Sequence, residues 1–149
     1  MKVALCHVRF GQFSKDTLLE LQGVLQRTYL EQFGEHAKLS CIWRIVPRGQ
    51  GYTKSNIDHV SWLMIEAPAG ITLERRHQAL AALSDAWAEC AGVTTADIAL
   101  TVSDSDYVKA YRTLDARRVR PMRRLPFFLS RLWQMVTSRY RDGYFSLST

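Results

Sequence analysis

The sequence has no apolar run near the ~20 residues that a helix needs to cross a bilayer. Its N-terminus also differs from a secretory signal peptide, because His7 and Arg9 interrupt the only apolar stretch there. Cysteine is scarce, and Cys6, Cys41 and Cys90 lie far apart without Cys-x-x-Cys spacing. This odd, scattered set argues against a disulfide framework or a zinc site, so we expect buried free thiols. We therefore expect an intracellular, cytoplasmic protein.

Positive charge is scarce in most of the chain and concentrated near its C-terminus. The formal net charge is +6, yet residues 112–141 contain nine arginines and a single acid, Asp115. That segment carries +8, so the rest of the chain carries −2. Any partner that recognises a basic surface is therefore expected at the C-terminus.

The chain is long enough for one globular domain. It has 149 residues, of which 47% are hydrophobic and 23% charged, as in ordinary soluble domains. A chain of this length buries a substantial core.

The first third of the chain has the pattern strand, helix, strand. Residues 3–10 are mostly apolar and predict a strand. Ser14 is a capping residue for a helix with a broad apolar face, which Gly34 ends. Residues 39–46 predict the next strand, and the polar, glycine-containing segment 48–56 predicts a loop.

The same pattern follows in the next third. Residues 60–67 form a nearly unbroken apolar run, typical of a strand that is buried on both faces. Thr72 is placed to cap a helix over residues 73–90, and Gly92 stands where a helix needs a left-handed stop. Residues 98–102 alternate as a strand. The short connections favour parallel strands within this unit.

The two units are related by one offset of 58 residues. With this offset, Ser14 corresponds to Thr72 and Gly34 to Gly92, and the strand at residues 3–10 corresponds to residues 61–68. We predict an α/β (α+β) fold of two tandem β-α-β units, with a four-stranded sheet and two helices on one face. Two known folds have this order of elements, and one of them is the ferredoxin-like sandwich.

The other is the fold of the tautomerase superfamily, and here the resemblance extends to local sequence. The segment GITLERRHQALAALSDAWAECAGVTTADIALTVSD resembles the second-half helix and strand of that family. FGQFSKDTLLELQGVLQRTYLEQFGE resembles the first-half counterpart. The layout from Lys2 to Asp106 is similar to the 4-oxalocrotonate tautomerase, malonate semialdehyde decarboxylase and chloroacrylate dehalogenase branches. The resemblance implies a homotrimer. A physical reason agrees, because a sheet with helices on one face leaves its other face in need of cover, and Trp62 and Met64 lie on one side of a central strand.

The family's catalytic residue is a proline that becomes N-terminal when the initiator methionine is removed. Its secondary amine acts as a base or nucleophile at neutral pH. This chain begins Met1-Lys2-Val3 and has no proline before Pro47. We therefore expect standard tautomerase activity to be low or absent.

Supporting residues of the family are also replaced. Gln12 stands where members place an arginine after the first strand, and Ala69 and Ile71 stand where decarboxylase-like members have arginines. Lys38 or Leu39 lies near the position of an acidic residue that opens the second strand. Together these differences argue against conventional tautomerase or dehalogenase chemistry.

Lys2 is the candidate catalytic residue, because it lies at the mouth of the expected pocket. A buried primary amine acts as a general base or forms a Schiff base. The alternative is a solvated lysine at the end of a strand. The candidate substrate-binding residues are Arg44, Arg48 and Arg112, which suit a carboxylate, and Tyr52 in the polar loop. Arg44 could equally face solvent.

No metal and no cofactor is expected. His36, His59 and His77 show no ligand spacing, and His7 within the first strand is typical of a structural histidine. Two functions therefore stay open. The first is an enzyme that acts on a small oxo- or unsaturated carboxylic acid through an amine other than proline. The second is a non-catalytic binding or assembly module.

A C-terminal extension follows the resemblance. We divide the chain into a double β-α-β domain at 1–110 and a basic extension at 111–149. Residues 117–124 predict a basic linker, and Pro126 predicts the first turn of a helix. The apolar stripe of that helix consists of Phe128, Leu129, Leu132, Met135 and Val136. We expect this stripe to pack on its own domain or a neighbouring subunit. Contact of residues 117–141 with anionic lipid or nucleic acid is the alternative.

Overall fold

The structure is a computed structural model, and it describes residues 2–34, 37–48, 60–118 and 121–148. Its elements are, in chain order, β1 (Lys2–Arg9), α1 (Lys15–Phe33), β2 (Leu39–Val46), β3 (Ser61–Ala67), α2 (Leu73–Ala91), a 3₁₀ turn (Thr95–Asp97), β4 (Ile98–Asp104), α3 (Ser105–Arg118), α4 (Pro121–Asp142) and β5 (Phe145–Ser148). Every predicted strand and helix of the first 104 residues is present.

The strands form one sheet in the order β4-β3-β1-β2-β5. Within each β-α-β unit the two strands are parallel, as predicted: β1 with β2, and β3 with β4. The two units join through the antiparallel pair of β1 and β3. The sheet has five strands and not the four that we predicted, because β5 adds to the outer edge of β2 in parallel orientation.

The predicted helix caps are confirmed in both units. The Ser14 hydroxyl accepts a hydrogen bond from the Thr17 amide at 3.1 Å, and the Thr72 hydroxyl accepts one from the Arg75 amide at 3.2 Å. Gly92 ends α2 in the left-handed conformation with φ of 64°. The caps recur at the same offset as in the sequence, which supports the internal repeat.

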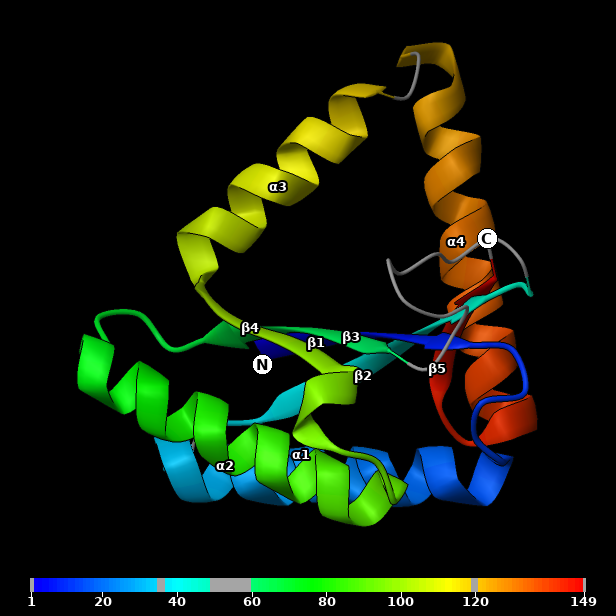
Figure 1. The fold of residues 1–149 in the computed structure, drawn as a ribbon. Coiled ribbons are helices and arrows are strands. Elements are labelled where there is room, and N and C mark those ends of the chain that lie inside the picture. Colours follow the sequence, from blue (N-terminus) through cyan, green and yellow to red (C-terminus); the bar gives the residue numbers. More distant parts are fainter. Residues whose placement is uncertain (1, 35–36, 49–59, 119–120, 149) are drawn as a thin grey trace.

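The core lies between the sheet and the two helices α1 and α2, which both cover one face (Figure 1). Trp43 of β2 and Trp87 of α2 are fully buried there, with ring centroids 5.9 Å apart. Cys6 and Cys41 are buried free thiols on the same face, while Cys90 is half-buried. A hydrogen bond with Cys41, together with burial, raises the pKa of the Cys6 thiol well above its ordinary value.

The other face of the sheet carries a row of apolar side chains from four paired strands. Met64 pairs with Leu5, Leu5 with Ile42, and Ile42 with Phe145. No helix lies flat against this row in the part of the chain that the structure describes; α3 and α4 rise from the two edges of the sheet (Figure 1). We call this row and the neighbouring Trp62, which is 42% exposed, the open face.

Two predictions about the C-terminal extension are wrong. The segment 117–124 is not a linker, because α3 continues to Arg118 and α4 begins at Pro121. Pro126 is inside α4 and not in its first turn. The sequence offers two prolines that suit a helix start, and the structure uses the earlier one. Arginine has a high helix propensity, so an arginine-rich segment supports helices as well as a linker.

The apolar stripe of α4 is uncovered in the single chain. Phe128, Leu129 and Leu132 are 50%, 57% and 59% exposed. Trp133 beside them is 70% exposed. Over the described residues, no helix is both long and apolar enough to cross a membrane.

Candidate functional site

Lys2 lies at the start of β1, next to the end of β3 and the start of α3. Its amine is 3.4 Å from the Oε1 atom of Glu66 and donates a hydrogen bond to the Ser105 hydroxyl. The Ser105 hydroxyl in turn donates to the carbonyl of Ala67 at 3.2 Å. An amine, a carboxylate and a hydroxyl therefore converge here. We call Lys2, Glu66 and Ser105 the N-terminal cluster.

The cluster is largely shielded from solvent. The Glu66 side chain is 11% exposed and the Lys2 side chain 27% exposed, and Ser105 is buried. Tyr29 of α1 donates a hydrogen bond from its hydroxyl to the Glu66 carbonyl at 2.8 Å. Burial and, secondly, the nearby Glu66 carboxylate raise the pKa of the Tyr29 phenol. A buried carboxylate is costly unless it is paired, and Lys2 supplies one ion pair to Glu66.

The structure does not bring Arg44 to the N-terminal cluster. Lys2 pairs with Leu39 on β2, whereas Arg44 pairs with His7, five residues further along the strands. That separation is about 16 Å at the usual rise of a strand. Arg44 is exposed, so it is too distant to hold a substrate beside the Lys2 amine.

Arg48 lies at the opposite end of β1. Its guanidinium lies close to Gly11, in the turn after β1: the Nη2 atom of Arg48 would be 3.5 Å from a Cβ atom added to that glycine. Arg112 is in α3, about two helical turns beyond Ser105, and its side chain lies outside the described residues. Tyr52 also lies outside them. Of the four predicted substrate-binding residues, the structure therefore locates the side chains of two, and neither is near Lys2.

His7 lies on the open face, between its neighbours Trp62 and Arg44. Its ring centroid is 4.8 Å from that of Trp62. Burial, and secondly the positive charge of Arg44, lower the pKa of His7. His7 is therefore packed against an aromatic ring as a neutral side chain at neutral pH. Among the described residues, no group of three or more His, Cys, Asp or Glu side chains is placed to hold a metal ion.

Gln12 connects the two β-α-β units. Its side-chain oxygen accepts a hydrogen bond from the Arg9 amide at 2.9 Å, and its nitrogen donates to the Ser61 hydroxyl at 3.2 Å. Gln12 thus ties the turn after β1 to the first residue of β3. This contact gives Gln12 a structural role at the position where the resemblance places an arginine.

Sequence reasoning missed two members of the N-terminal cluster, Glu66 and Ser105. Glu66 had a signal, because it is the single acid within the apolar run of β3, and a charge inside a buried strand needs a partner. Ser105 had none, because its contact with Lys2 joins residues 103 positions apart.

Comparisons with known proteins bear on the fold alone. No family model matches the sequence, and no curated protein matches it. Solved structures do match. One is a structure of N1, a member of the cis-3-chloroacrylic acid dehalogenase (cis-CaaD) family. It has 11% identity and a TM-score of 0.62, and the match covers 68% of this chain and 73% of that chain.

Native fused 4-OT matches with 15% identity over 68% of this chain and 85% of that chain, with a TM-score of 0.61. Malonate semialdehyde decarboxylase matches with 10% identity over 69% and 84%, with a TM-score of 0.57. These structures belong to the superfamily that the sequence resembles, and about a third of the present chain lies outside each match. The chain therefore has the fold of tautomerase-superfamily structures.

Proposed function

We propose that this protein is a diverged tautomerase-like binding and assembly module, a homotrimer in which the amine of Lys2 has a structural role in place of a catalytic one. The ion pair between Lys2 and the shielded carboxylate of Glu66 carries the proposal. An ammonium group held by a carboxylate is neither a base nor a nucleophile until it loses its proton. No substrate-binding arginine whose side chain is described lies near it.

The open face supports the trimer. Leu5, Ile42, Met64 and Phe145 form a contiguous apolar row that no flat-lying helix covers within the described chain. Soluble proteins seldom leave such a patch exposed, and a sheet with helices on one face needs a second layer. Two of the solved structures that share this fold are described as a symmetric and an asymmetric trimer of fused 4-OT.

The assay that tests the proposal is turnover of phenylpyruvate and 2-hydroxymuconate. We expect no rate above that of buffer for the full-length protein and for Lys2→Ala alike. Removing a positioned general base typically costs ~10²–10⁴ in rate, so a genuine Lys2 enzyme would show a large difference between the two. Turnover by the wild type that is lost in a folded Lys2→Ala variant would contradict the proposal.

A second function rests on the convergence of amine, carboxylate and hydroxyl in the N-terminal cluster. The same groups would suit an enzyme that acts on a small oxo acid through Lys2. A Schiff base between Lys2 and a 2-oxo acid would be trapped by borohydride as a stable adduct, which mass spectrometry would locate on the peptide that contains Lys2. Such an adduct, absent from Lys2→Arg, would favour the enzyme over the module.

A further inference from the structure

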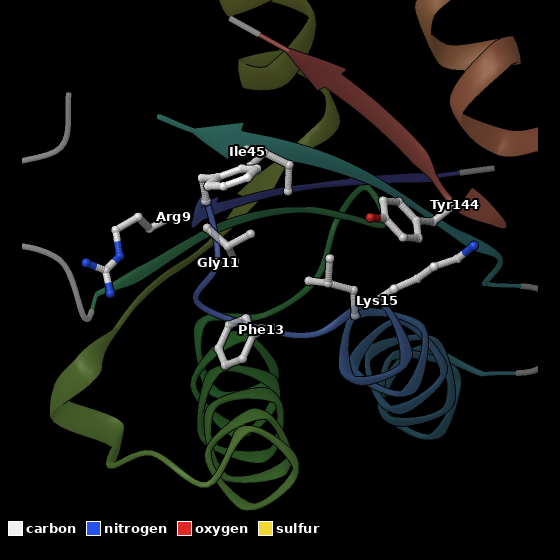
Figure 2. A pocket seen from close by; sticks show the side chains of 9 residues that line it. Arg9, Gly11, Phe13, Lys15, Ile45 and Tyr144 are labelled. Carbon is white, nitrogen blue, oxygen red and sulfur yellow. The ribbon is translucent and has the colours of Figure 1, made fainter. Parts of the chain in front are cut away.

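A cavity of about 150 Å³ lies at the end of β1 that is remote from the N-terminal cluster. Figure 2 shows the residues that surround it: Gly11 in the turn after β1, Phe13 and Lys15 at the start of α1, Ile45 of β2, and Tyr144 just before β5. The volume equals that of about five liquid waters. It is therefore large enough for a small organic molecule.

The Tyr144 hydroxyl is the polar group that points into this cavity (Figure 2). The Tyr144 side chain is buried, with 9% of the residue exposed, and its ring lies edge-on to Trp43 at 6.2 Å. Its hydroxyl makes no hydrogen bond with any residue that the structure describes. Burial raises the pKa of this phenol, so it remains a neutral donor at physiological pH. A buried tyrosine hydroxyl usually has a hydrogen-bond partner. Here a molecule bound in the cavity would supply that partner.

The start of α1 gives the same cavity a preference for negative charge. The first amides of a helix have no partner within the helix, and the positive end of the helix dipole favours anions. In α1 the Ser14 hydroxyl satisfies the Thr17 amide, which leaves the amides of Lys15 and Asp16 without an intrahelical acceptor. The Arg48 guanidinium adds a positive charge at the rim, close to Gly11.

Two acids lie near this end of α1, and neither lines the cavity. Asp16 in the first turn of α1 is exposed to solvent. Asp142, two residues before Tyr144, is held by Arg141 at 2.9 Å. The Lys15 amine donates to the carbonyl of Arg141 at 3.1 Å, so the Lys15 stem lines the cavity while its charge lies outside. Arg9 also points its guanidinium away from the cavity (Figure 2). The remaining walls are apolar, from side chains that include Leu18 and Ile45.

We propose that this cavity binds a small carboxylic acid with a short apolar body. The carboxylate accepts a hydrogen bond from the Tyr144 hydroxyl at the positive end of α1, and the apolar body lies against Phe13, Leu18 and Ile45. Tyr144 belongs to the C-terminal extension, so the extension completes the site by carrying this residue to the end of β1. The proposal is independent of the trimer and of the role of Lys2.

The test uses benzoate as the probe and benzamide as its neutral match in shape, each titrated against the full-length protein by ligand-observed NMR. We expect saturable benzoate binding and benzamide binding weaker by about tenfold or more, since hydrogen bonds to a charged group are stronger than those to a neutral one. Tyr144→Phe removes only the hydroxyl and should weaken benzoate binding by a similar factor. Tyr140→Phe, at an 89% exposed position in the same extension, is the matched control and should bind as the wild type does.

Arg48→Gln provides a second test of the same site. Arg48 is exposed, so this substitution does not disturb a buried position. It should weaken benzoate binding and leave benzamide binding unchanged. Equal affinities for benzoate and benzamide, or benzoate binding unaffected by Tyr144→Phe, would overturn the proposal. So would an absence of saturable benzoate binding at millimolar concentrations. None of these results would alter the trimer or the turnover assay, so the two proposals fail separately.

Discussion

Lys2 and Glu66 form an ion pair that is partly removed from water, where the loss of one partner costs more than the pair itself contributes. Lys2→Met removes the Lys2 amine from the Glu66 carboxylate while keeping the length of the side chain. We expect this change to lower the free energy of unfolding by about 1–2 kcal/mol, less than for a fully buried pair, because Lys2 keeps some exposure. Urea denaturation of the full-length protein measures it.

The double variant Lys2→Met with Glu66→Gln should recover part of that loss, since the carboxylate that lost the Lys2 amine is then replaced by a neutral amide. The matched control is Lys109→Met, which breaks the exposed pair with Asp106, 3.3 Å long. Exposed pairs contribute roughly 0–1 kcal/mol, so the control should differ little from the wild type. If Lys109→Met lowers the free energy of unfolding as much as Lys2→Met does, the N-terminal cluster has no special role in stability.

The lowered pKa of His7 predicts that the stability of the protein depends on pH. Its pKa in the folded protein is below the ordinary value of 6.5, chiefly because of burial. Between that lowered value and 6.5 the unfolded chain binds a proton that the folded chain does not, so stability falls as the pH drops through this window. His7→Gln should flatten the stability profile between about pH 7 and pH 5. An unchanged slope in thermal melts across this range would show that other groups cause it.

At the scale of elements, two glycines in the repeated helices provide a paired test. Gly92 ends α2 with φ of 64°, where an L residue is strained, whereas Gly23 lies inside α1 and nothing is within 4 Å of an added Cβ. Gly92→Ala should lower the free energy of unfolding by about 1 kcal/mol, and Gly23→Ala should raise it by roughly 0.5–1 kcal/mol. Chemical denaturation gives both values, and shifts of the same sign would contradict the assignment of the cap.

The first four strands and first two helices were predictable because local chemistry specifies them. Ser14 and Thr72 cap their helices through bonds to amides three residues later, and the alternation in the strands matches the buried face. A capping hydroxyl and a positive-φ glycine act over a few residues, so the sequence shows them directly. The same locality made the offset of 58 visible.

The fifth strand and the N-terminal cluster were not predictable on these grounds. The four residues of β5 include two serines, and their pairing with β2 depends on α4 carrying them to that edge. Tyr144, just before β5, likewise reaches the cavity only because α4 carries it to that edge. Glu66 and Ser105 meet Lys2 across more than sixty residues of sequence. Contacts between residues so far apart in sequence follow from the topology of the fold, and they leave no periodic pattern in the sequence.

At the scale of the whole molecule, the exposed stripe of α4 needs a partner. Leu129, Leu132 and Trp133 are each more than half exposed in the single chain, and burying a large apolar side chain contributes on the order of 1.5–3 kcal/mol before entropy is deducted. We expect the stripe to pack on a neighbouring subunit, with the arginines left outside as a basic rim. Deleting residues 122–149 should then lower the melting temperature or weaken the trimer.

Leu132→Glu tests the same contact without removing β5 or Tyr144. It should shift the trimer toward smaller species in sedimentation velocity, whereas Tyr140→Glu, on the same helix and 89% exposed, should not. If Leu132→Glu stays trimeric while wild-type protein binds anionic vesicles and the variant does not, the stripe contacts a membrane surface and our assignment of a protein partner is wrong.

The most direct test of the central claim is sedimentation equilibrium of the full-length protein at micromolar concentration. The chain has a mass of 17.1 kDa, and a homotrimer of three chains has about 51 kDa. We predict the trimer mass, because the open face and the α4 stripe both need cover. A single species of 17.1 kDa would contradict the account, since both apolar surfaces would then remain exposed to water in a stable monomer.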